Sequence, residues 1–222
     1  MPDQTPPIKL SARLAADTRS NSGNVAMARD EQETLSIGEF FAAISGHDGV
    51  FELVGGIVYV TTGGTEAHNV ICSNVLTALV PAAKRTGARA TSRLTGVRTA
   101  PDTVRYPDVV VDCSPPDAAA MTASRPVMIV EIASIAIPVV DYGTRLCEYQ
   151  ALDGVDTVMQ IEVAFACVLV HRRQEDGSWT AERVEQFGVA IALPSLATSL
   201  TLDEIYDTLA VKPRPRLRRQ QR

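Results

Sequence analysis

The chain has 222 residues, of which 45% are hydrophobic and 21% are charged, which is enough apolar material for one substantial core. Six of the last eleven residues are basic, and removing them leaves 15 basic residues against 26 acidic ones. Such an acidic body is unlike a protein that coats nucleic acid by charge alone. No run of about 18 apolar residues predicts a membrane-spanning helix.

Composition also predicts the domain organisation. Residues 1–34 are polar without a sustained apolar period and are expected to be disordered, whereas 35–210 form one domain and 211–222 a basic tail. The N-terminus has no apolar segment typical of a secretory signal. The four cysteines lie among apolar neighbours without a CxxC pair, so we interpret them as reduced core residues of a cytoplasmic protein.

The first half of the domain predicts helix, hairpin and helix. Residues 36–45 form an amphipathic segment, and Ser36 is placed to begin it with a capping box. FELVGGIVYVTTGG (51–64) predicts a hairpin that turns at its paired glycines. Residues 65–87 have the strongest helical periodicity, and Pro81 is expected to kink this helix or to end it early.

The second half is dominated by strands. Its expected elements are three strands (88–100, 103–113 and 126–134), a helix near 139–152, three further strands (156–163, 165–173 and 178–188) and a short helix at 201–210. This order predicts an α/β (α+β) fold with a mixed sheet flanked by helices, not a regularly alternating doubly wound fold. No GxGxxG or GxxxxGK[ST] segment supports nucleotide binding.

Two carboxylates interrupt apolar strand segments. Asp108 follows Pro107 and opens the run VVV, and Glu131 lies inside VMIVEIAS. A buried carboxylate is usually protonated, paired or bound to a cation. If the two strands are neighbours, both side chains converge, and a divalent cation between them would relieve their repulsion. Oxygen ligands without a histidine pair favour Mg²⁺ or Mn²⁺ over zinc.

Five segments within residues 36–175 follow one another in a characteristic order and spacing: FELVGGIVYV, TEAHNVICSNVLTAL, RYPDVVVDC, VMIVEIAS and DYGTRLCEYQALDGVDTV. Together they resemble the Uma-two family of restriction-endonuclease-like proteins, in the PD-(D/E)xK nuclease superfamily. The resemblance implies a restriction-endonuclease-like fold, a metal site made by Asp108 and Glu131, and Glu52 and His68 close to that site. It also implies a Mg²⁺- or Mn²⁺-dependent endonuclease that acts on DNA and works as a homodimer.

The lysine of the superfamily motif is missing from both of its usual places. Ala133 stands two residues after Glu131, and Arg145 occupies the lysine position of the family's helix segment. Arginine keeps the positive charge but stays protonated, so Arg145 cannot act as a general base. It could still stabilise charge on the scissile phosphate. The family's Pro-Ser-Thr after the strand is replaced by Ile135, Ala136 and Ile137.

Asp108 and Glu131 each have an alternative structural interpretation. Asp108 could end a turn after Pro107, because Pro-Asp is common in turns. Glu131 could be one member of an ion pair with Arg105 or Arg125.

The remaining candidates are also residue types that serve structural roles. Arg145 could form helix-surface pairs with Asp141 and Glu148, worth about 0.2–0.5 kcal/mol each. His68 lies near a helix start, where a histidine commonly has a structural role. Glu52 could be an ordinary charged residue of the hairpin. A second hypothesis is therefore a catalytically silent nuclease fold that binds nucleic acid or a protein partner.

Overall fold

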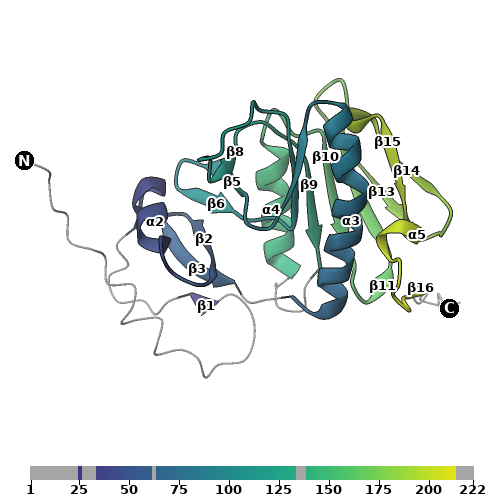
Figure 1. Cartoon of the computed structure of the whole chain (residues 1–222), viewed down its shortest axis with the longest axis horizontal. Helices are drawn as coiled ribbons and strands as arrows, with labels where there is room; N and C mark the ends of the chain where they lie inside the picture. The colour runs from purple at the N-terminus through teal and green to yellow at the C-terminus, as the bar shows by residue number, and fades with distance from the viewer. Residues whose placement is uncertain (1–24, 27–33, 62–63, 134–138, 214–222) are drawn as a thin grey trace, which may run out of the picture.

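The computed structural model describes residues 25–26, 34–61, 64–133 and 139–213, so the rest of the predicted disordered segment and most of the basic tail lie outside the described residues. Two six-stranded sheets organise the described part. The N-terminal sheet has the order β1-β3-β2-β6-β5-β8, and the central sheet has the order β13-β12-β10-β9-β7-β4. Figure 1 shows the N-terminal sheet with α2 on one side of the molecule and the central sheet beside it. The mixed α/β class is as predicted, but the strands divide between two large sheets.

The N-terminal sheet is built on the predicted hairpin. Its turn is made by Gly55 and Gly56, whose φ angles of +57° and +79° belong to the left-handed region that glycine adopts without strain. The helix before it begins at Ser36 with the predicted capping box. The elements are α2 (Ile37–Ile44), β1 (Val25–Ala26), β2 (Val50–Val54), β3 (Ile57–Thr61), β5 (Gly96–Ala100), β6 (Thr103–Arg105) and β8 (Thr122–Ala123).

Helix α3 (Glu66–Arg85) covers one face of the central sheet. It begins after Thr65, whose side chain accepts a hydrogen bond from the backbone N–H of His68. The helix continues past Pro81 to Arg85, so the expected early end is wrong; the proline is exposed and its ring is accommodated at the helix surface. The buried side of α3 presents an apolar row to the sheet, namely Ile71, Val75 and Leu79.

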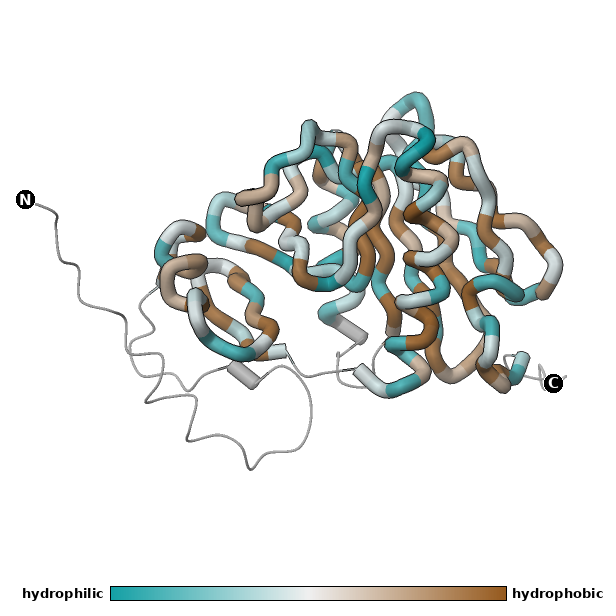
Figure 2. Tube along the Cα trace, in the orientation of Figure 1, coloured by the Kyte–Doolittle hydropathy of each residue, from teal (hydrophilic) through white to brown (hydrophobic). Residues whose placement is uncertain are grey.

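The inner strands of the central sheet are buried on both faces. Val109 and Val130 belong to the core formed with α3, whereas Ile129 packs with Tyr149 of α4 (Val139–Gln150) on the opposite face. This double burial explains why the inner strands are nearly continuous apolar segments, which Figure 2 shows through the centre of the molecule. The strands are β4 (Arg89–Ser92), β7 (Val109–Asp112), β9 (Pro126–Ile132), β10 (Thr157–Ile161), β12 (Val168–Arg173) and β13 (Trp179–Val184).

Two segments that the sequence predicts as single strands pass from one sheet to the other. Residues 88–100 form β4 and β5, with a turn between them, and residues 103–113 form β6 and β7 on either side of Pro107. Proline cannot donate a ladder hydrogen bond, so the pairing ends there and the chain changes sheet. Asp108 therefore lies at the junction between the two sheets.

The C-terminal part adds short elements at the far end of the central sheet. The predicted helix at 201–210 is reduced to one turn, α5 (Leu202–Ile205), which begins with a capping box at Thr201. The strands of a small hairpin, β14 and β15, were not predicted. The remaining elements are β11 (Phe165–Ala166), β14 (Ala190–Leu193), η1 (Pro194–Leu196), β15 (Thr198–Thr201) and β16 (Lys212–Pro213).

Membrane and cysteine predictions can be compared with the same structure. Within the described ranges, none of the helices has the length and apolar character needed to cross a membrane. All four cysteines are free thiols, as expected. Cys167 is buried, but Cys147 is exposed on α4, so its interpretation as a core residue is wrong.

Candidate active site

Asp108 directly precedes β7, and Glu131 lies on β9, the antiparallel neighbour of β7, as the sequence predicts. The register pairs Val109 of β7 with Val130 of β9, so Asp108 and Glu131 are the next residues in this direction along the two chains. The backbone N–H of Ile132 donates a 2.7 Å hydrogen bond to Asp108 Oδ2. Both carboxylates are buried, with 6% and 3% of their surface exposed, so Asp108 is not a solvent-exposed turn residue.

His68 reaches this pair from the first turn of α3. Its Nε2 lies 3.1 Å from Asp108 Oδ1, and the ring is almost fully buried. The hydrogen bond with Asp108 is the largest influence on His68 and raises the pKa of the imidazole, while burial opposes that rise. The Cys72 thiol, one turn later on α3, contacts the main-chain oxygen of Asp108 at 3.6 Å. The N-cap at Thr65 thus fixes the helix end that positions His68.

Glu131 is held on the α4 side of the sheet. The Tyr149 hydroxyl donates a 2.6 Å hydrogen bond to Glu131 Oε1, and Arg145 Nη1 lies 3.6 Å from the same oxygen. Burial raises the pKa of Glu131 to about 7; Arg145 opposes this rise, and the Asp108 carboxylate adds to it. Burial therefore favours the protonated form of Glu131 more strongly than it would be favoured in a solvent-exposed carboxyl group.

Arg145 binds Glu52 in a bidentate ion pair. Its Nη1 and Nη2 lie 2.8 and 2.7 Å from the two Glu52 carboxylate oxygens, and its Nε donates to Asp141 at 2.7 Å. The Tyr106 backbone N–H also donates to Glu52. Only 2% of Arg145 is exposed. Of the two predicted surface pairs, the one with Asp141 is present, but it is part of a buried network.

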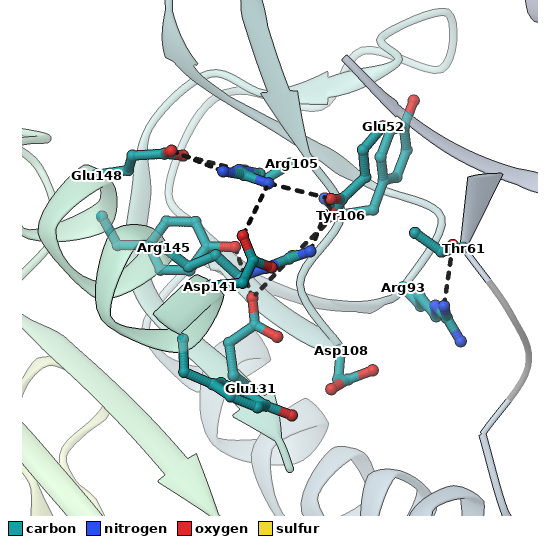
Figure 3. Close-up of polar contacts among 12 residues, drawn as sticks. Glu52, Thr61, Arg93, Arg105, Tyr106, Asp108, Glu131, Asp141, Arg145 and Glu148 are labelled. Carbon is teal, nitrogen blue, oxygen red and sulfur yellow. Dashed lines mark hydrogen bonds and ion pairs between the residues drawn. The ribbon is translucent and has the colours of Figure 1, made fainter. Parts of the chain in front are cut away.

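Arg105 was not predicted as part of this network. It is 2% exposed and donates to Glu148 from Nε and Nη2, at 2.8 and 2.7 Å, while its Nη1 lies 3.3 Å from Glu52. Figure 3 shows Arg105 and Arg145 between the carboxylates of β2 and α4. Arg105 thus pairs with Glu52 and Glu148, and Arg145 is the arginine near Glu131. The sequence signal that could have identified Arg105 is the presence of an arginine inside the apolar segment TVRYP.

Asp112, at the other end of β7, belongs to a separate cluster. Its carboxylate accepts hydrogen bonds from the backbone N–H groups of Ser114 and Arg125 and an ion pair from Arg89. These contacts hold the loop before β9 in place. The hydrogen bond from the Arg125 N–H keeps Arg125 beside Asp112.

The carboxylates of Asp108 and Glu131 are suited to a hard divalent cation. Their mutual repulsion inside a low-dielectric site is the condition that a bound cation relieves. Among the described residues, no group of three or more His, Cys, Asp or Glu side chains is arranged to hold a metal ion. Mg²⁺ commonly binds through one or two carboxylates, several waters and substrate phosphates, so two carboxylates fit this ion.

The chain is similar to a known protein family and to a solved structure. The model of the Uma2 family, described as "Putative restriction endonuclease", matches residues 37–204. A comparison with curated proteins found no match. A crystal structure of a putative nuclease belonging to DUF820, from Anabaena variabilis, is similar to this chain with a TM-score of 0.62 and 20% sequence identity. The similarity covers 78% of this chain and 97% of that one, and it shows the fold. Because the family model spans more than half of the sequence, the chain belongs to the Uma2 family of restriction-endonuclease-like proteins.

Proposed function

We propose that this protein is a divalent-metal-dependent endonuclease that hydrolyses phosphodiester bonds in DNA. The observation that carries the proposal is the placement of two buried carboxylates, Asp108 just before β7 and Glu131 on the neighbouring strand β9, in a chain of this family. The raised pKa of Glu131, caused first by burial, supports the same reading, because perturbed carboxyl groups concentrate at functional sites.

Asp108 and Glu131 would hold Mg²⁺ or Mn²⁺. Such an ion would lower the pKa of a bound water and stabilise negative charge on the phosphate. The chain's own groups keep the two carboxylates in position: His68 and the Ile132 N–H fix Asp108, and the Tyr149 hydroxyl fixes Glu131. Preorganisation of this kind reduces the cost of arranging the site for reaction.

Arg145 and Glu52 support the site from one side. The positive charge of Arg145 favours ionised Glu131, and the paired Glu52 holds the guanidinium in place. Arg145 could neutralise charge that develops on the phosphate, although direct contact would require its bidentate pair with Glu52 to open. In the proposed enzyme Arg145 therefore acts mainly by positioning Glu131.

Cleavage of supercoiled plasmid DNA with Mg²⁺ or Mn²⁺ tests the proposal. We expect nicking by the wild type that is abolished in Asp108→Ala and Glu131→Gln, which also control for contaminating nucleases when purified identically. Arg145→Lys should cleave faster, because a buried lysine can release its proton whereas arginine cannot. The proposal is wrong if neither the wild type nor Arg145→Lys nicks DNA at any tested metal concentration.

A second candidate function is the binding of nucleic acid or of a protein partner, without cleavage, by a nuclease fold that has lost its activity. The bidentate pair of Arg145 with Glu52 favours it, because that pair occupies the position where the family's lysine would be. DNA binding by the wild type together with no cleavage by Arg145→Lys would support this candidate over the enzyme.

A further inference from the structure

Arg93 lies in the same row as the two candidate metal ligands. It directly follows Ser92, which pairs with Val109 across antiparallel β4 and β7. Arg93 and Asp108 are the next residues after that pair, where both strands leave the ladder, and the β7–β9 pairing of Val109 with Val130 leads in the same direction to Asp108 and Glu131. A cation and two carboxylates thus stand in a row at one end of three adjacent strands, β4, β7 and β9.

The N-terminal sheet holds the Arg93 guanidinium in this place. Arg93 Nη2 donates a 3.1 Å hydrogen bond to Thr61 Oγ1 at the end of β3, and that hydroxyl donates to the Val50 carbonyl at 3.1 Å. Figure 3 shows Arg93 and Thr61 on the Asp108 side of the site, away from Arg105 and Arg145. The guanidinium is therefore anchored at the junction where the chain passes between the two sheets.

Arg93 differs from the other two arginines of the site in exposure. Arg105 and Arg145 are each 2% exposed and lie among carboxylates, whereas Arg93 is half-buried and reaches solvent. Its charge acts on the Asp108 side: the hydrogen bond with Asp108 raises the pKa of His68, and Arg93 works against that rise. Burial raises the pKa of Cys72 to about 11, and Arg93 opposes this shift too.

We propose that Arg93 contacts the DNA phosphate that lies against Asp108 and Glu131. The inference rests on the proposed function, and it assigns the substrate contact to a residue that neither the motif nor the buried network includes. A guanidinium offers a planar pair of donors that matches two phosphate oxygens. A phosphate in this row would have the carboxylates on one side and Arg93 on the other.

Binding of a fluorescent DNA duplex, measured by anisotropy in Ca²⁺ at several salt concentrations, tests the contact. Arg93→Gln should weaken binding about tenfold or more and reduce the slope of log K against log salt by about 0.9, the value for one lost phosphate contact. Arg98→Gln, on the exposed side of β5, removes the same charge and should change affinity less than twofold. Arg93→Lys should restore the slope but only part of the affinity.

The outcomes separate this inference from the proposed function. Wild-type affinity and slope in Arg93→Gln, in a protein that binds and cleaves DNA, would overturn the role of Arg93 and leave the nuclease proposal intact. Equal losses in Arg93→Gln and Arg98→Gln would also overturn it, because only net charge would then matter. A wild type that neither binds nor cleaves DNA overturns both. If Arg93→Gln does not fold, Arg93→Lys decides by its affinity: unchanged binding contradicts a bidentate contact.

Discussion

At the scale of single residues, Glu131 is a buried carboxyl group with polar and charged neighbours. It is 3% exposed, receives a hydrogen bond from Tyr149 and lies between the charges of Asp108 and Arg145. Its pKa is raised from the ordinary value of 4.5 to about 7, with burial as the largest cause. In the metal-free folded protein the protonated form of Glu131 is therefore favoured more strongly than in the unfolded chain.

This pKa makes the stability of the metal-free protein depend on pH. From about pH 4.5 to 7 the folded chain keeps a proton on Glu131 that the unfolded chain has released, so this group's contribution to stability falls as pH rises through that window. Glu131→Gln removes the ionisation and keeps an acceptor for Tyr149. Relative to the wild type, the variant should gain up to about 3 kcal/mol of unfolding free energy between pH 5 and pH 8.

Urea unfolding in EDTA at pH 5, 6, 7 and 8 measures this difference. Glu175→Gln, in the exposed turn between β12 and β13, controls for the loss of one negative charge. A stability difference between Glu131→Gln and the wild type that stays constant over this pH range would contradict the raised pKa.

At the scale of elements, a buried ion network joins the N-terminal sheet to α4. Glu52 of β2 and Arg105 of β6 meet Arg145 and Glu148 of α4, all through short contacts. Removing one partner of a buried pair leaves an uncompensated charge, which commonly costs about 3–5 kcal/mol. The network therefore fixes the position of α4, the helix that carries Tyr149 to Glu131.

Arg145→Ala should accordingly lower the free energy of unfolding by about 3–5 kcal/mol, because Glu52 would remain buried without its bidentate partner. Arg183→Ala is the matched control: its pair with Glu185 is 3.7 Å long and largely exposed, so the expected loss is within about 1 kcal/mol. Urea midpoints of both variants give the comparison. Equal losses would mean that the buried network contributes no more than a surface pair.

Local signals made several elements predictable. Ser36 begins α2 with a capping box, the paired glycines turn the hairpin, and helical periodicity predicts α3. Asp108 and Glu131 could be placed together because sequential strands commonly pair. These inferences needed only neighbouring residues or the simplest connection between strands.

The remaining features depend on contacts between distant residues. Pro107 marks a break, but its local effect does not say that β6 and β7 enter different sheets. The pairs of Glu52 with Arg105 and Arg145, and of Arg105 with Glu148, join residues 43 to 93 positions apart, so spacing within one element cannot identify them. The role of Arg93 depends on the register between β4 and β7, which no single strand pattern specifies.

At the scale of the whole molecule, the two sheets meet at the candidate active site. The central sheet supplies Asp108 and Glu131, α3 supplies His68, and the N-terminal sheet supplies Glu52. Figure 3 shows how Glu52, Asp108 and Glu131 lie around the junction between the sheets. Because the site depends on both sheets and both long helices, its residues come together only in the folded protein, and all of them lie within the family-matched residues 37–204.

The central claim is that Asp108 and Glu131 hold a divalent cation. Calorimetric titration of the full chain with Mn²⁺, at pH 8 and at two temperatures, tests it without knowledge of the DNA substrate. We predict one binding site per chain in the wild type, lost in Asp108→Ala and retained in Asp153→Ala, which removes an exposed carboxylate. No binding by the wild type at either temperature, or equal binding by Asp108→Ala, would contradict the claim.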